Sequence, residues 1–67
     1  MEIILNNQTQ QAEEKTSVQA ALNNWIGEKQ NGIAVAVNEA IVPKAQWDTY
    51  MLQHNDKVLV IKATQGG

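Results

Sequence analysis

The sequence predicts a small α+β fold, a mixed sheet of four to five strands with one main helix packed across one face. Three observations lead to this prediction. Short β-rich apolar runs lie near both ends of the chain, and one strongly amphipathic segment lies between them. The length of 67 residues also leaves no room for the crossover helices of a doubly wound fold. We therefore treat residues 1–67 as a single domain with a flexible tail over about residues 62–67.

The first element is a β-hairpin. The apolar run Ile3-Ile4-Leu5 is followed by Asn6-Asn7-Gln8, residues suited to a turn. A polar second strand is expected around Thr9–Ala12.

A helix follows over residues 17–30. The segment Thr16-Ser17-Val18-Gln19 fits a capping box at its start, and Asn31-Gly32 supplies a stop that tolerates left-handed conformations. One face of this helix is apolar at spacings i, i+3, i+4, i+7 and i+8, formed by Val18, Ala21, Leu22, Trp25 and Ile26. Trp25 is therefore expected in the core.

The second half of the chain supplies the other strands. Pro43 ends one of them because it cannot donate a ladder hydrogen bond, and Trp47 is expected in the core. The expected segments are strands at Ile33–Asn38 and Ile41-Val42, an irregular stretch or single helical turn at Lys44–Tyr50, a turn at Asn55-Asp56 and a last strand at Lys57–Thr64.

Composition excludes several classes of function. A net charge of −2 and the absence of arginine argue against nucleic-acid binding. Without cysteine the chain has no disulfide and no thiolate metal site, and it cannot carry sulfur on a thiol of its own. No apolar run approaches the 18 or so residues that span a membrane, and Met1-Glu2-Ile3 lacks the basic start of a signal peptide. We expect a cytoplasmic protein with no bound metal.

The most informative feature is the terminal pair Gly66-Gly67, which chance would produce in roughly one chain in 200. Without side chains, this end can enter a narrow catalytic tunnel and present its α-carboxylate. That carboxylate is ionised at neutral pH and is a poor electrophile, so it must be activated, most simply by adenylation with ATP. The alternative interpretation is an ordinary loose terminus.

Strand alternation predicts an apolar patch on the open face of the sheet, beside the tail. It consists of Ile4, Leu59 and Ile61. Contiguous exposed apolar area usually marks a partner site. The alternative is that this face is covered by side chains of the preceding loop, namely Trp47, Met51 or Leu52.

Three further candidates have mainly structural interpretations. His54, the single histidine, has no serine or cysteine nucleophile arranged near it and is expected in a surface loop. Glu13-Glu14 precede a helix N-terminus, where acidic residues are favourable. Lys44 either contacts acidic groups of a partner or is simply solvated.

Several blocks of the sequence resemble the ThiS family, the sulfur carriers of thiamine biosynthesis, which have the ubiquitin-like β-grasp fold. The blocks are Val37-Asn38, Ile41-Val42-Pro43-Lys44, Gln46-Trp47, Asp56-Lys57-Val58 and Gly66-Gly67. The resemblance spans nearly the whole chain, and its most specific part is Asn-x-x-Ile-Val-Pro-Lys/Arg-x-x-Trp. One departure is Asn55-Asp56, where the family usually has Gly-Asp, but asparagine also tolerates a left-handed turn.

The resemblance implies a carrier and not an enzyme. An adenylating enzyme of the ThiF type would use ATP to activate Gly67, and sulfur from a cysteine desulfurase would convert it to a thiocarboxylate. A thiazole synthase of the ThiG type would then consume this sulfur. The implied site comprises Gly66 and Gly67 as the reactive end and, for partner binding, Ile4, Leu59, Ile61 and Gln65.

Other interpretations share the diglycine. The small subunit of molybdopterin synthase usually has an aromatic-proline stretch before it, whereas this chain has Lys62-Ala63-Thr64-Gln65. A protein modifier that forms isopeptide bonds and a non-covalent binding module are the remaining alternatives.

Overall fold

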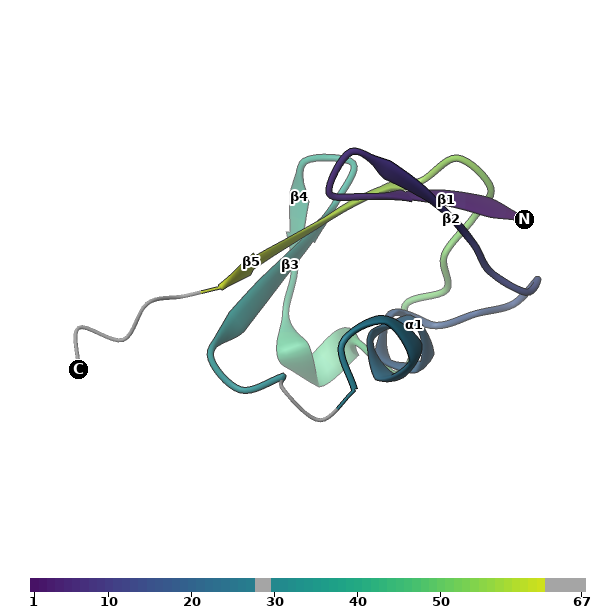
Figure 1. Cartoon of the computed structure of the whole chain (residues 1–67). Coiled ribbons are helices and arrows are strands. Elements are labelled where there is room, and N and C mark those ends of the chain that lie inside the picture. Colours follow the sequence, from purple (N-terminus) through teal and green to yellow (C-terminus); the bar gives the residue numbers. More distant parts are fainter. Residues whose placement is uncertain (28–29, 63–67) are drawn as a thin grey trace.

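The computed structural model describes residues 1–27 and 30–62, which form a five-stranded mixed sheet with one helix against one face (Figure 1). The elements are β1 Glu2–Leu5, β2 Gln8–Gln11, α1 Val18–Trp25, β3 Ile33–Val37, β4 Ala40–Val42, the 3-10 turn η1 Lys44–Gln46 and β5 Lys57–Lys62. The strand order is β2-β1-β5-β3-β4, in which β1 and β5 run parallel and the other neighbours antiparallel. The predicted fold class is therefore confirmed.

Both hairpins close through two-residue turns in which both central residues are left-handed. The φ angles are 48° and 69° at Asn6 and Asn7, and 52° and 73° at Asn38 and Glu39. Positive φ at both positions suits the right-handed twist of the flanking strands. Asparagine tolerates this conformation, whereas for glutamate it costs about 1–2 kcal/mol.

The helix begins one residue later than the capping-box pattern indicates. Ser17, and not Thr16, is the N-cap, and its Oγ accepts a hydrogen bond from the Ala20 backbone N–H at 3.1 Å. Position N3 is consequently Ala20, so Gln19 cannot complete a capping box. The preceding two N–H groups of the first turn donate to the loop that follows η1, from Val18 to the Tyr50 carbonyl at 2.9 Å and from Gln19 to the Trp47 carbonyl at 2.8 Å.

The helix also ends earlier than predicted, at Trp25 and not at residue 30. Gly27 has a φ of 75°, and its N–H, like that of Ile26, donates to the Leu22 carbonyl, at 3.1 and 2.8 Å. A left-handed glycine just past the last turn is a common helix stop because it has no Cβ to clash. The apolar pattern of the helix has no further member after Ile26, so it does not show where the helix ends. The predicted end was therefore set by the next stop signal, Asn31-Gly32.

The core lies between α1 and the sheet. The predicted helix face is buried at Val18, Ala21 and Leu22, but Trp25 is only partly buried and packs at the edge, so its place in the core was predicted too strongly. Trp47 is the tryptophan at the centre, 2 % exposed, with its Nε1–H donating to the Val42 carbonyl at 2.9 Å. The fully buried side chains are Ile3, Val18, Ala21, Leu22, Val35, Val37, Val42, Trp47, Leu52 and Val58.

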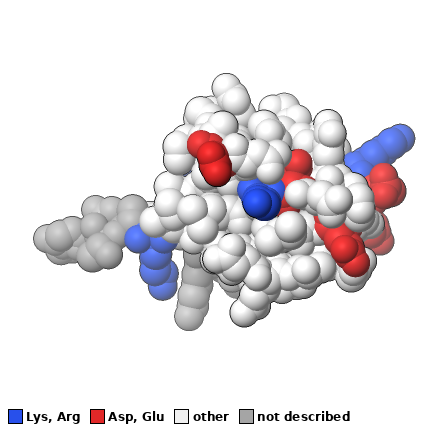
Figure 2. Space-filling model, turned by 90° about the horizontal axis from the view of Figure 1, so that it is seen from above, with Lys and Arg blue, Asp and Glu red and all other residues white. Residues whose placement is uncertain are grey.

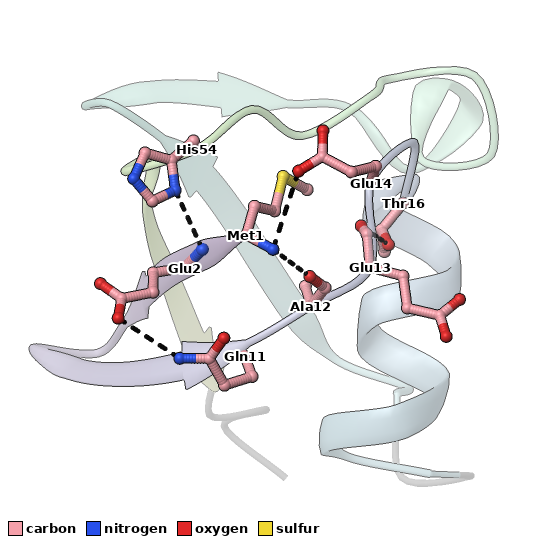
Figure 3. A network of polar contacts seen from close by, with 8 residues as sticks. All are labelled: Met1, Glu2, Gln11, Ala12, Glu13, Glu14, Thr16 and His54. Atoms are coloured by element: carbon pink, nitrogen blue, oxygen red, sulfur yellow. Dashed lines mark hydrogen bonds and ion pairs between the residues drawn. The ribbon is translucent and has the colours of Figure 1, made fainter.

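The start of β1 is fastened by a local polar network (Figure 3). The Met1 amine donates to the Ala12 carbonyl at 2.7 Å and lies 3.8 Å from a carboxylate oxygen of Glu14. The Glu2 backbone N–H donates to His54 Nδ1 at 3.0 Å. His54 is thus an exposed loop residue with a structural contact, as predicted.

Candidate docking surface and reactive tail

The face of the sheet opposite α1 carries the predicted apolar side chains. Along β5, Val58 is 2 % exposed and points toward the helix, whereas Leu59 and Ile61 are each 46 % exposed. Along β1, Ile3 is fully buried and its neighbour Ile4 is half-buried. Because successive side chains of a strand alternate between faces, Ile4, Leu59 and Ile61 share the open face.

The structure adds residues that the sequence analysis did not assign to this face. Ile41 is 64 % exposed, and the strand register places it opposite Ala36, which in turn lies opposite Leu59. Directly paired residues lie on the same face. Ile41 immediately precedes the buried Val42, so alternation along β4 was the signal that could have found it. We call this set the open-face patch: Ile4, Ala34, Ala36, Ile41, Leu59 and Ile61.

Figure 2, seen from above the sheet, shows a largely uncharged surface with a lysine near its middle and with charged side chains most numerous toward its right edge. A hollow of about 270 Å³ lies at one part of it. The charged residues that line this hollow are Glu39 and Lys57, and the others are apolar or carry side-chain amides: Ile4, Asn6, Asn7, Ala36, Val58 and Leu59.

The loop before β5 does not cover the open-face patch. Trp47 and Leu52 are buried in the core on the helix side, 2 % and 3 % exposed. Met51 is 45 % exposed but forms an isolated β-bridge with Ser17, beside the start of α1. The alternative in which these side chains shield the patch is therefore wrong.

Two of the sequence blocks that carry the family resemblance meet at one edge of the patch. The Asn38 side-chain amide donates to Asp56 Oδ1 at 3.0 Å, and Asn38 Oδ1 accepts from the Lys57 backbone N–H at 2.9 Å. The other Asp56 oxygen accepts from the Gln53 N–H at 2.8 Å. Asn55 lies in this turn with a φ of 71°, so asparagine adopts the left-handed conformation that glycine favours. These contacts fix the turn between β3 and β4 against the start of β5.

The predicted reactive end, Gly66 and Gly67, and the partner-binding candidate Gln65 lie outside the described residues. The chain reaches them directly from β5, the central strand of the sheet, whose outward-facing Leu59 and Ile61 belong to the patch. Lys44 is exposed at the first position of η1.

The described residues contain no group of three or more histidine, aspartate or glutamate side chains arranged to hold a metal ion. Within residues 1–27 and 30–62, the helix is too short and too polar to cross a membrane.

Comparisons with known proteins agree with this arrangement. The model of the ThiS family matches residues 2–67. The sulfur carrier protein ThiS of Escherichia coli (strain K12) is 33 % identical over 67 residues, which cover all of both chains. A crystal structure of the thiamine biosynthesis protein ThiS from Geobacter metallireducens shares the fold, with a TM-score of 0.87 over the full length of both chains at 17 % identity. With a family match over almost its whole length, a relative of equal length and the same β-grasp architecture, the chain belongs to the ThiS family.

Proposed function

We propose that this chain is a sulfur carrier of thiamine biosynthesis, a co-substrate of other enzymes and not an enzyme itself. The observation that carries the proposal is the family match over residues 2–67, which includes the diglycine that follows β5 in the sequence. The exposed apolar face next to that strand supports it, because a carrier must dock on the enzymes that act on its tail.

The proposed chemistry takes place at the Gly67 carboxylate. A carboxylate oxygen attacks the α-phosphorus of ATP and pyrophosphate leaves, which converts a poor electrophile into an acyl-adenylate. The outer sulfur of a persulfide formed by a cysteine desulfurase then attacks the acyl carbon and AMP leaves. A thiol reductant cleaves the S–S bond of the resulting acyl disulfide, and a thiocarboxylate remains at Gly67. The domain supplies no acid or base to these steps. It supplies a docking surface and a terminus narrow enough to enter the active site of a partner.

Two partner enzymes follow from this role. An adenylating enzyme of the ThiF type would form the acyl-adenylate, and a thiazole synthase of the ThiG type would accept the sulfur. We expect both to bind the open-face patch, with Gln65 lying in the channel that leads to the reaction centre. We place these encounters in the cytoplasm.

The tail sequence favours this role over that of a molybdopterin synthase small subunit. Residues 62–65 contain neither the aromatic residue nor the proline expected in that subunit. A covalent protein modifier would instead accumulate joined through its C-terminus to a lysine of another protein.

Intact-mass analysis of the chain isolated from its native cells tests the proposal. The expected product shows the mass gain of one oxygen-to-sulfur exchange, located at Gly67 by fragmentation. A large adduct on a lysine of another protein would indicate a modifier. Two measurements together would contradict the carrier role. The first is an unmodified Gly67 in cells that are actively making thiamine. The second is the absence of a thiocarboxylate in cells that lack the thiazole synthase, where it should accumulate.

A further inference from the structure

Glu39 occupies a backbone position that is unfavourable for its residue type. It is the second central residue of the turn between β3 and β4, with a φ of 73°, a position where glycine is strongly preferred in such turns. Strained positions of this kind persist where the surrounding structure or the function requires them. The neighbouring Asn38 is anchored to Asp56 and Lys57, so the turn is fixed independently of Glu39.

The side chain of Glu39 contributes no polar contact to the described part of the fold. Among the described residues, the carboxylate of Glu39 has no hydrogen bond and no ion pair, and the one ion pair found there joins the Met1 amine to Glu14. Glu39 is exposed and lines the hollow of the open face beside Ile4 and Leu59. A carboxylate is thus held at the margin of an apolar surface without a partner within the described chain.

Recognition of the carrier before its activation poses a specific physical problem. The reactive end, Gly66-Gly67, has no side chains, so it carries no information that distinguishes this chain from another diglycine protein. An apolar patch adds affinity but is non-directional. Polar groups placed around the patch on the folded domain can supply the selectivity and register that neither the diglycine nor the apolar surface provides.

We propose that Glu39 is a specificity residue that pairs with a cationic side chain, a guanidinium or an ammonium, on the enzyme that adenylates Gly67. The inference depends on the proposed carrier function and adds the chemistry of the contact. Glu39 is the acidic residue among those that line the hollow, so a cation of the partner finds its complement there and nowhere else in the hollow. Lys57 also lines the hollow and would repel a cation placed on its side. The pair therefore favours one orientation of the bound partner.

The test compares three variants with the original chain in titration calorimetry against the purified adenylating enzyme. Glu39→Gln keeps the size of the side chain but removes its charge. It should weaken binding about tenfold at low salt. The difference should shrink toward zero as salt is raised, because screening weakens a contact at the rim of an interface. Glu13→Gln makes the same charge change at an exposed site in the loop before α1 and should leave the affinity unchanged.

The third variant, Glu39→Gly, separates stability from docking. It should raise the melting temperature by about 2–8 °C, because it removes the left-handed glutamate, a gain that the backbone entropy of glycine in the unfolded chain partly offsets. It should weaken binding as much as Glu39→Gln does. A merely structural residue would not give this opposite pair of effects.

The outcomes separate the role of Glu39 from the docking surface, and none of them bears on the carrier function, which the mass of the modified chain tests. If Glu39→Gln binds as the original chain does while Leu59→Glu abolishes docking, the role of Glu39 is refuted and the docking surface stands. If neither substitution affects binding, the open face is not the docking surface and both conclusions fail. If Glu13→Gln weakens binding as much as Glu39→Gln does, the effect reflects net charge and the specific pairing is refuted.

Discussion

The side-chain oxygen of Asn6 accepts a hydrogen bond from the backbone N–H of Val60 at 2.8 Å, joining residues that are 54 positions apart. The pairing of β1 with β5 reaches Leu5 and Val58, after which the chain turns away into β2. Asn6 donates its own N–H to the Val58 carbonyl at 2.9 Å. Its side-chain oxygen then accepts from Val60 as the backbone carbonyl of a further β1 residue would. The turn thereby holds β5 two residues further toward the tail.

We predict that Asn6→Gly loosens the end of β5 without disturbing the turn. Glycine accepts the φ of 48° at this position but lacks the acceptor for the Val60 N–H. Amide hydrogen exchange should show a clear loss of protection at Val60. Asn6→Asp keeps an oxygen in the same place and should retain the protection; equal exchange in both variants would show that the side chain of Asn6 is not the acceptor that matters.

A second prediction concerns the contacts of Asn38. Asn38→Gly preserves the left-handed backbone but removes two side-chain hydrogen bonds, to Asp56 and from the Lys57 N–H. The free energy of unfolding should fall by about 1–2 kcal/mol, since each such bond contributes about 0.5–1.5 kcal/mol. Urea denaturation of Asn38→Gly, Asp56→Ala and the double variant should give a coupling energy above about 0.5 kcal/mol. Strict additivity would mean that the two side chains act independently.

The fold could be predicted because its signals are local. Period-2 apolar runs, one amphipathic face and asparagine-rich turns each act over a few residues, and together they allow little besides one helix on one sheet. The two ends of the helix were less accessible. Ser17 and Thr16 are both suitable N-caps by residue type. The Trp47 and Tyr50 carbonyls accept from the N–H groups of the first turn, and only the tertiary fold brings them there.

The candidate site was predicted in part for the same reason. Alternation within a strand identified Ile4, Leu59 and Ile61, but the contribution of Ile41 depends on the register between β3 and β4. The position of Trp25 at the edge of the core, and not inside it, has a similar origin. Helical periodicity shows which face Trp25 belongs to but not how far that face extends under the sheet, and no periodic pattern places Trp47.

A third prediction follows from these tryptophans. Trp47→Ala should cost about 3–5 kcal/mol, the range for a buried aromatic residue, and leave most of so small a domain unfolded. Trp25→Ala should cost less, about 1–2 kcal/mol, because Trp25 packs at the edge of the core and part of its side chain stays in contact with water. Urea denaturation followed by far-ultraviolet circular dichroism measures both. Comparable midpoints for the two variants would contradict the difference in burial.

The fourth prediction uses a matched pair of exposed residues. Leu59 and Met51 are 46 % and 45 % exposed, but they lie on the open face and beside the start of α1, respectively. Leu59→Glu should weaken binding to the adenylating enzyme more than tenfold, because burying an unpaired carboxylate costs at least a few kcal/mol. Met51→Glu should bind normally. Equal behaviour of the two variants in calorimetry would remove the argument for the open-face patch.

The fifth prediction concerns the reactive end. Deletion of Gly67 withdraws the carboxylate by about 3.3–3.6 Å, which is enough to lose an attack geometry. Gly66→Val widens a segment that must remain narrow, and one residue added after Gly67 converts its carboxylate into an amide. Each change should abolish ATP–pyrophosphate exchange by the adenylating enzyme and leave the melting temperature unchanged. Normal exchange with the extended chain, without prior trimming, would refute the role of Gly67.

The last strand in the sequence is the middle strand of the sheet, and this has a consequence for synthesis on the ribosome. Until residues 57–62 emerge, the nascent chain has two separate hairpins, and an isolated hairpin is at best marginally stable in water. The domain can therefore complete its sheet only after residues 57–62 have left the ribosome. We expect a product truncated before β5 to remain unfolded and open to proteolysis, and so not to act as a folded decoy for the partner enzymes.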